Sequence, residues 1–143
     1  MAQRLAYPVS LDRQDDGTVL ASFPDIPEAL TEGATEEEAL AEAEDCLIAA
    51  LGGYIQERRK IPRPSPARGR PLVALPALVA AKTALYSEMR VQGIGNTELA
   101  KQLGITEGAV RRLIDPDHRS HIGQVETALG ALGQRLVVAT QAA

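Results

Sequence analysis

Four prolines lie within eleven residues near the middle of the chain and restrict its fold more than any other feature. They are Pro62, Pro64, Pro66 and Pro71, with Gly69 between the last two. Proline lacks a backbone donor and disfavours the helical conformation in the residue before it. The segment 61–71 is therefore predicted to be an extended, stiff linker between two parts of the chain.

The two parts carry net charges of opposite sign. Residues 1–60 hold 5 Lys and Arg against 13 Asp and Glu, whereas residues 61–143 hold 10 against 6. An acidic part suits a basic protein, and a basic part suits nucleic acid. We therefore predict a domain over residues 1–75, which includes the linker, and a second domain over 76–143, each with its own partner.

Composition excludes several classes of protein. Of the 143 residues, 45% are apolar and 24% are charged, which is typical of a globular chain. No apolar run reaches the roughly 18 residues of a membrane span, and no secretory leader is expected. Cys46 is the single cysteine, which excludes an intrachain disulfide and a zinc cluster and favours the cytoplasm. We expect no cofactor, no metal and no membrane contact.

The first half has the pattern of a small antiparallel sheet. Apolar residues alternate with others from Leu5 to Leu11, and the turn at 15–17 leads into a returning strand at 18–23. A short third strand is expected at 29–31, and a last one at 72–75.

One helix should follow these first strands. Thr35 and Glu38 form a capping box at its start, and the cations at 58–60 suit its end. The prolines of segment 24–27 should interrupt the sheet, and Pro8 would be unfavourable in an interior strand.

The second half is predicted to be helical. A first helix begins at Pro76 and closes at Gly93, where glycine can adopt a left-handed conformation. Two short helices at about 97–103 and 107–114 follow, then a helix through Val125 and Leu132. Residues 136–138 are expected to form a short final strand.

Segment 96–114 matches the spacing of a helix-turn-helix. Ala100 is small enough for a close helix crossing, Gly104 suits the tight turn, and Thr106 can cap the second helix. The apolar positions that should hold the pair are Leu99, Leu103, Ile105, Val110 and Leu113. A plain three-helix bundle is the alternative. The residues expected to contact DNA bases or phosphates are Asn96, Thr97, Thr106, Glu107, Gly108, Arg111, Arg112 and Arg119.

The acidic residues of the first half allow more than one interpretation. Asp25, Glu28 and Glu32 extend an acidic helix surface that could dock a cationic protein, although a charged run is usually only a solvated face. A metal-dependent nuclease is less favoured, because its candidate carboxylates crowd turns. Those candidates are Asp12, Asp15, Asp16 and Asp25. His118 and His121 are interpreted as loop residues and not as metal ligands.

Several short motifs in order resemble the HicB-type antitoxins, in their helix-turn-helix subtype. These motifs are Tyr7–Val9, Phe23–Ala29, Thr31–Thr35, Glu38–Leu40, Ile61–Ser65 and Asp115–Ser120. The resemblance implies an α+β chain. A partial, non-catalytic ribonuclease-H-like β-β-β-α-β domain would come first. An all-α helix-turn-helix domain with a short C-terminal strand would follow.

The same resemblance implies the partners. The first domain would mask a small basic HicA-type toxin that cleaves mRNA, and the second would bind operator DNA, repress the operon and form a homodimer or a dimer of dimers. The chain itself would catalyse nothing. A stand-alone transcription regulator with a ligand-sensing first domain is the alternative function, and a deep apolar pocket in that domain would favour it.

Overall fold

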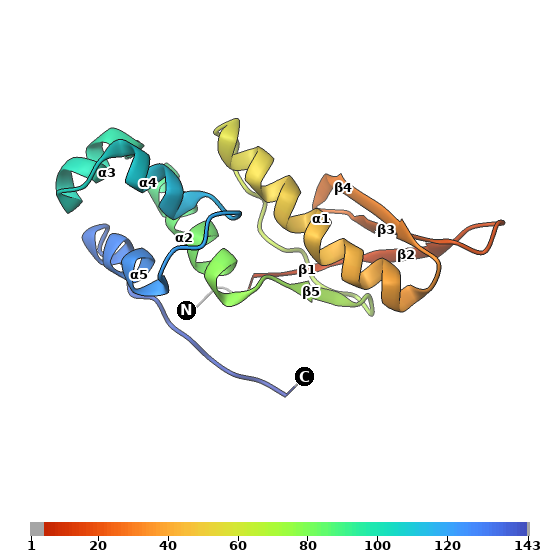
Figure 1. Cartoon of the computed structure of the whole chain (residues 1–143). Coiled ribbons are helices and arrows are strands. Elements are labelled where there is room, and N and C mark those ends of the chain that lie inside the picture. Colours follow the sequence, from red (N-terminus) through yellow and green to blue (C-terminus); the bar gives the residue numbers. More distant parts are fainter. Residues whose placement is uncertain (1–4, 143) are drawn as a thin grey trace.

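The computed structural model describes residues 5–142 and is an α+β structure with strands first and most helices last. The strands form a two-stranded and a three-stranded sheet. Figure 1 shows these strands and the long first helix at one end of the molecule and the remaining helices at the other. The elements are β1 (Ala6–Pro8), β2 (Ser10–Arg13), β3 (Val19–Phe23), β4 (Ile26–Gly33), α1 (Glu36–Gln56), β5 (Leu72–Ala74), α2 (Ala77–Gln92), α3 (Asn96–Leu103), α4 (Glu107–Ile114) and α5 (Ile122–Ala131).

The predicted opening strand is split in two at Val9. Its first part, β1, pairs antiparallel with β5, and its second part, β2, pairs antiparallel with β3. The Val9 amide donates to the Pro71 carbonyl at 2.9 Å. Because donors alternate between the two edges of a strand, the amide that Pro8 lacks would face away from β5. The proline is therefore tolerated, and no strand of the described chain needs a hydrogen bond from it.

Strand β4 is longer than the predicted third strand. It starts at Ile26 and includes Pro27, so the interruption of the sheet is limited to a turn and a register shift at Ser22 and Phe23. In the three-stranded order β2-β3-β4 this strand lies at an edge, where a missing donor costs little.

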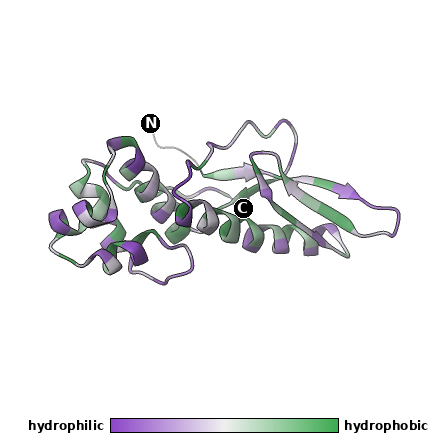
Figure 2. Ribbon diagram, turned by 90° about the horizontal axis from the view of Figure 1, so that it is seen from above, coloured by the Kyte–Doolittle hydropathy of each residue, from purple (hydrophilic) through white to green (hydrophobic). Residues whose placement is uncertain are grey.

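Helix α1 covers one face of the sheet. Figure 2 shows its outer side hydrophilic and its sheet side hydrophobic. The predicted cap is confirmed at Thr35, whose Oγ1 accepts from the Glu38 amide at 3.1 Å. The Glu38 side chain also reaches back, but its Oε2 accepts from the amide of Ala34, one residue before the cap, at 3.0 Å. The predicted end of the helix is wrong by a few residues, because α1 stops at Gln56 and Arg58 has a φ of 58°.

The proline segment contains no helix, as predicted, but it is not extended throughout, because residues 67–70 form a turn in which Arg68 and Gly69 have positive φ. Side chains from both halves bind this segment and the residues just before it. Tyr7 Oη donates to the Pro62 carbonyl at 2.7 Å, and Tyr86 of α2 donates to the Arg59 carbonyl at 2.7 Å. The buried apolar side chains form one cluster that runs from the sheet through α1 into the helices. The division at residues 75 and 76 stays a prediction.

The helices of the second half begin and end close to where the sequence places them. Gly93 and Gly104 both adopt a left-handed conformation, each with a φ of 68°. The predicted strand at 136–138 is wrong. Val137 and Val138 are 63% and 73% exposed, and no strand of the described residues lies alongside to pair with them. The segment after α5 runs on as an extended tail (Figure 1).

Candidate functional site

The turn between α3 and α4 is built by two residues that the sequence singles out. Gly104 takes the left-handed conformation that closes α3, and a Cβ there would meet no atom within 4 Å, so backbone conformation is the requirement. Thr106 Oγ1 then accepts from the Ala109 amide at 3.1 Å and caps α4. Both predicted roles are confirmed.

The apolar side of the two helices is buried. Leu99 and Val110 are fully buried, Leu113 is nearly so and Leu103 is half-buried. The prediction that Ile105 holds the pair is wrong, because this residue lies in the turn with 40% of its surface exposed. The helix pair is confirmed as a structure, and its interpretation as a DNA-binding helix-turn-helix stays a prediction.

The residues expected to contact DNA differ in exposure. Thr97, Thr106, Arg111, Arg112 and Arg119 are exposed. Glu107 and Gly108 are half-buried at the start of α4, and Asn96 is buried, with only 7% of its surface exposed.

Three of these residues form one hydrogen-bonded group. Glu107 Oε2 accepts from Asn96 Nδ2 at 3.0 Å, and Glu107 Oε1 accepts from Arg111 Nη2 at 2.6 Å. The bonds from Arg111 and then from Asn96 lower the pKa of the Glu107 carboxyl, and the same carboxylate raises the pKa of Arg111. The glutamate is therefore ionised and fixed at neutral pH.

Lys82 of α2 is fully buried, and the sequence pattern did not mark it as a residue of the site. Its ammonium donates to the carbonyl oxygens of Arg112 and Asp115 at 2.7 and 2.9 Å and to Ser120 Oγ at 2.8 Å. Burial lowers the pKa of Lys82, and the charge of Asp115 opposes that shift. The signal was a lysine within the apolar stripe of α2, between Leu78 and Leu85.

The three acidic residues expected to bind a protein partner have different roles in this structure. Asp25 Oδ2 accepts from the amide and hydroxyl of Ser65, both at 3.0 Å, and so fastens the proline segment. Glu28 pairs with Arg59 at 2.7 Å and accepts from Tyr54 Oη at 2.8 Å, and these bonds, that of Arg59 most, lower the pKa of its carboxyl. Glu32 is exposed. Of the three carboxylates, that of Glu32 is therefore the most accessible to a protein partner.

Glu32 belongs to a sheet face that α1 does not cover. The register pairs Glu32 of β4 with Leu20 of β3, and it pairs Leu20 with Asp12 of β2. The next row joins Leu30, Ser22 and Ser10, and Leu30 is 55% exposed. We call these six residues the outer sheet face.

The exposed side of α1 adds to the negative charge of this half. All of its acidic residues outside the core are exposed, and the segment after the helix contributes one more. They are Glu36, Glu37, Glu38, Glu42, Glu44, Asp45 and Glu57.

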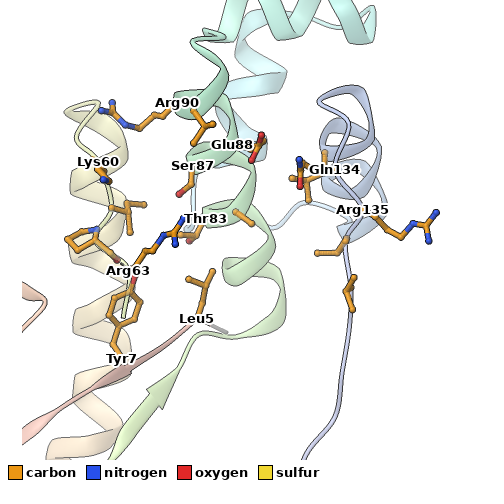
Figure 3. A pocket seen from close by; sticks show the side chains of 17 residues that line it. Leu5, Tyr7, Lys60, Arg63, Thr83, Ser87, Glu88, Arg90, Gln134 and Arg135 are labelled. Carbon is orange, nitrogen blue, oxygen red and sulfur yellow. Dashed lines mark hydrogen bonds between the residues drawn. The ribbon is translucent and has the colours of Figure 1, made fainter. Parts of the chain in front are cut away.

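A groove of about 860 Å³ lies between the halves, not inside the first one. Figure 3 shows Lys60 and Arg63 on one side of α2, Ser87 on α2 itself, and Gln134 on the other side. A ligand-sensing first domain would need a pocket enclosed by the sheet and α1, and this groove does not meet that requirement.

Within residues 5–142, no three His, Cys, Asp or Glu side chains are placed to share a metal ion. His118 Nδ1 lies 3.3 Å from Ser120 Oγ, as suits a loop residue. None of the helices in that same range has the length and apolar character that crossing a bilayer requires.

These features define an α+β protein, with an acidic sheet-and-helix half followed by a small helical half that exposes arginines. Comparison with known proteins gives the family. The family model described as HicB_like antitoxin of bacterial toxin-antitoxin system matches residues 6–84. The chain belongs to this HicB-like family, which is a family of antitoxins and not of enzymes.

Named relatives match nearly the whole chain. Antitoxin HicB 2 of Photorhabdus laumondii is 41% identical over 136 residues, which cover 95% of this chain and 96% of that protein. Antitoxin HicB of Escherichia coli K12 is 36% identical over 92% of this chain and 96% of its own length. Antitoxin HicB of Pseudomonas fluorescens is 39% identical over 91% and 90%. The resemblance seen in the sequence motifs is thereby confirmed.

Proposed function

We propose that this chain is the antitoxin of a type II pair and also the repressor of its own operon. Its first half binds and masks a small basic, mRNA-cleaving toxin of the HicA type in the cytoplasm. Its second half binds operator DNA through α3 and α4. Inhibition is steric and electrostatic, so the chain performs no chemistry on RNA.

The observation that carries this proposal is the separation of charge onto two surfaces. In the first half, Asp12 and Glu32 flank apolar Leu20 on the outer sheet face, with Leu30 in the next row. Further acidic side chains stand on the opposite side of this half, along the exposed side of α1. A flat face that combines leucines with carboxylates suits a cationic protein, because apolar contact supplies affinity and charge supplies steering.

The second surface is the exposed side of α4. Arg111 and Arg112 point into solvent there, whereas the apolar side of the same helix is buried. Arginine pairs with guanine edges or with phosphate oxygens, and the capped start of α4 adds backbone donors. One such helix would bind weakly, so a homodimer or a dimer of dimers should present two, about 34 Å apart.

Two measurements test the two halves separately. Co-expression with the small basic protein encoded next to this chain, followed by pull-down at low salt, tests the antitoxin role. A gel shift with the DNA upstream of the pair tests the repressor role. The antitoxin proposal fails when no complex survives at low salt, and the repressor proposal fails when upstream DNA is not preferred over unrelated DNA.

A further inference from the structure

Glu107 is the centre of a polar group that ties the two short helices together. Its Oε2 accepts from Asn96 Nδ2 at 3.0 Å and from Arg111 Nε at 3.4 Å, and its Oε1 accepts from Arg111 Nη2 at 2.6 Å. The group therefore links the first residue of α3, the first residue of α4 and the residue one turn later.

Packing alone does not account for the asparagine. Asn96 is 93% buried, by its exposed fraction of 7%, and its Oδ1 has no hydrogen-bond partner. A buried acceptor without a partner destabilises the folded state, and an apolar residue would avoid that cost. What Asn96 provides in return is its bond to Glu107, which fixes the carboxylate from the buried side.

The fixed carboxylate then orients Arg111. A guanidinium has five N–H donors, and Glu107 engages two of them from the helix side. The other three remain for a ligand, since the Arg111 side chain is 69% exposed. Within residues 5–142, no carboxylate pairs with the Arg112 guanidinium in this way, and the carbonyl oxygen of Arg112 accepts from Lys82 and Ser120.

We infer that Glu107 is a positioning and specificity-determining residue, which with Asn96 holds Arg111 in one orientation for base readout. The inference rests on the proposed DNA binding. A carboxylate near the DNA backbone weakens binding to every sequence, because it repels phosphate. A pre-oriented arginine strengthens binding only where a base edge matches it. The hydrogen-bonded group of Asn96, Glu107 and Arg111, which we call the clamp, therefore lowers the affinity for DNA in general and raises the preference for the operator.

The test compares two DNA fragments of equal length, the upstream region of the pair and the same region with its base order scrambled. Full-length wild type, Glu107→Gln and Glu98→Gln are titrated against both by fluorescence anisotropy. Glu98 is an exposed carboxylate in the first turn of α3, so its variant changes the charge by the same amount without touching the clamp.

Glu107→Gln should bind the scrambled fragment several-fold more tightly and lose about tenfold of its preference for the upstream fragment. Glu98→Gln should shift both affinities together and keep the preference. Asn96→Ala, which changes no charge, should also lower the preference, with thermal unfolding measured to show that the chain is folded. If Glu107→Gln keeps the wild-type preference for the upstream fragment, the inference is overturned and Glu107 has only a structural role in joining α3 to α4.

A different result would contradict the proposed operator binding itself. Wild-type protein that binds the two fragments equally would remove the proposed operator binding, and with it the basis for a specificity residue. The two failures are distinguished by the wild-type preference, which is measured first in the same experiment.

Discussion

The ammonium of Lys82 lies 2.7 Å from the carbonyl oxygen of Arg112, so α2 holds the end of the helix that exposes both arginines. The last carbonyls of a helix lack partners within it, and a cation is favoured at this negative end. Lys82 also reaches Asp115 and Ser120, so one side chain fixes both α4 and the loop that carries Arg119.

Replacing Lys82 by methionine should therefore destabilise the helical half. The change keeps the apolar stem but leaves two carbonyls and a hydroxyl without their charged donor, at a cost of about 3 kcal/mol in the free energy of unfolding. Urea unfolding followed by circular dichroism measures it. Lys101→Met, at an exposed position of α3, is the control and should change stability by less than about 0.5 kcal/mol. Equal values for the two variants would contradict the role given to Lys82.

Two glycines of the first half should respond in opposite directions to alanine. A Cβ on Gly33 would lie 2.5 Å from the Ala39 amide nitrogen, at the point where β4 meets the start of α1. Gly33→Ala should thus force the helix away and destabilise by about 1–3 kcal/mol. Gly53 lies inside α1 with nothing within 4 Å of its added Cβ, so Gly53→Ala should stabilise by about 0.5–1 kcal/mol. Differential scanning calorimetry compares them, and two shifts of the same sign would refute this account.

The first half should lose stability at alkaline pH through Tyr7. Burial, and then the charge of Asp25, raise the pKa of Tyr7 from 10.0 to about 12. The unfolded chain releases this proton at the lower value, so the contribution is complete below pH 10 and lost as the pH rises to about 12. Unfolding free energies between pH 9 and 12 should fall more steeply for wild type than for Tyr7→Phe. Tyrosinate absorbance follows the same titration, and parallel slopes would argue against it.

The sequence predicts local structure well wherever a short-range rule governs it. Thr35, Gly104 and Thr106 act through neighbours three to five residues away, and each has its predicted role. The split at Val9 could not be predicted, because it depends on β5, more than sixty residues later. The tail at 136–138 has strand propensity, but no strand of residues 5–142 pairs with it, and propensity alone does not make a strand.

The sequence predicts which residues of the candidate sites are exposed, but it does not predict the hydrogen bonds between them. The arginines of α4 are exposed, as their spacing indicates. The bonds of Glu107 to Asn96 and of Lys82 to Arg112 cross between helices and leave no periodic signal. Glu28 resembled a free surface charge in the sequence, yet Tyr54 and Arg59 occupy its carboxylate.

Reversing a charge on the outer sheet face should weaken toxin binding. Glu32→Lys places a cation beside Leu20 and Leu30, where a basic partner would meet it, and we expect at least a tenfold loss of affinity. Calorimetric titration with the adjacent small basic protein, at two salt concentrations, measures this loss. Glu126→Lys makes the same charge change at an exposed position of α5 and should leave the affinity nearly unchanged. Equal losses in both variants would indicate general charge attraction without a defined face.

The two arginines of α4 should each contribute to operator binding. Arg111→Ala and Arg112→Ala should weaken binding to the upstream fragment by about 1–3 kcal/mol if they contact base edges. A phosphate contact would instead weaken binding to all sequences alike and reduce the salt dependence. Anisotropy titrations over a range of salt separate these cases. Arg68→Ala removes an exposed arginine of the proline segment and serves as the control. Unchanged affinity in both α4 variants would move the DNA contact away from α4.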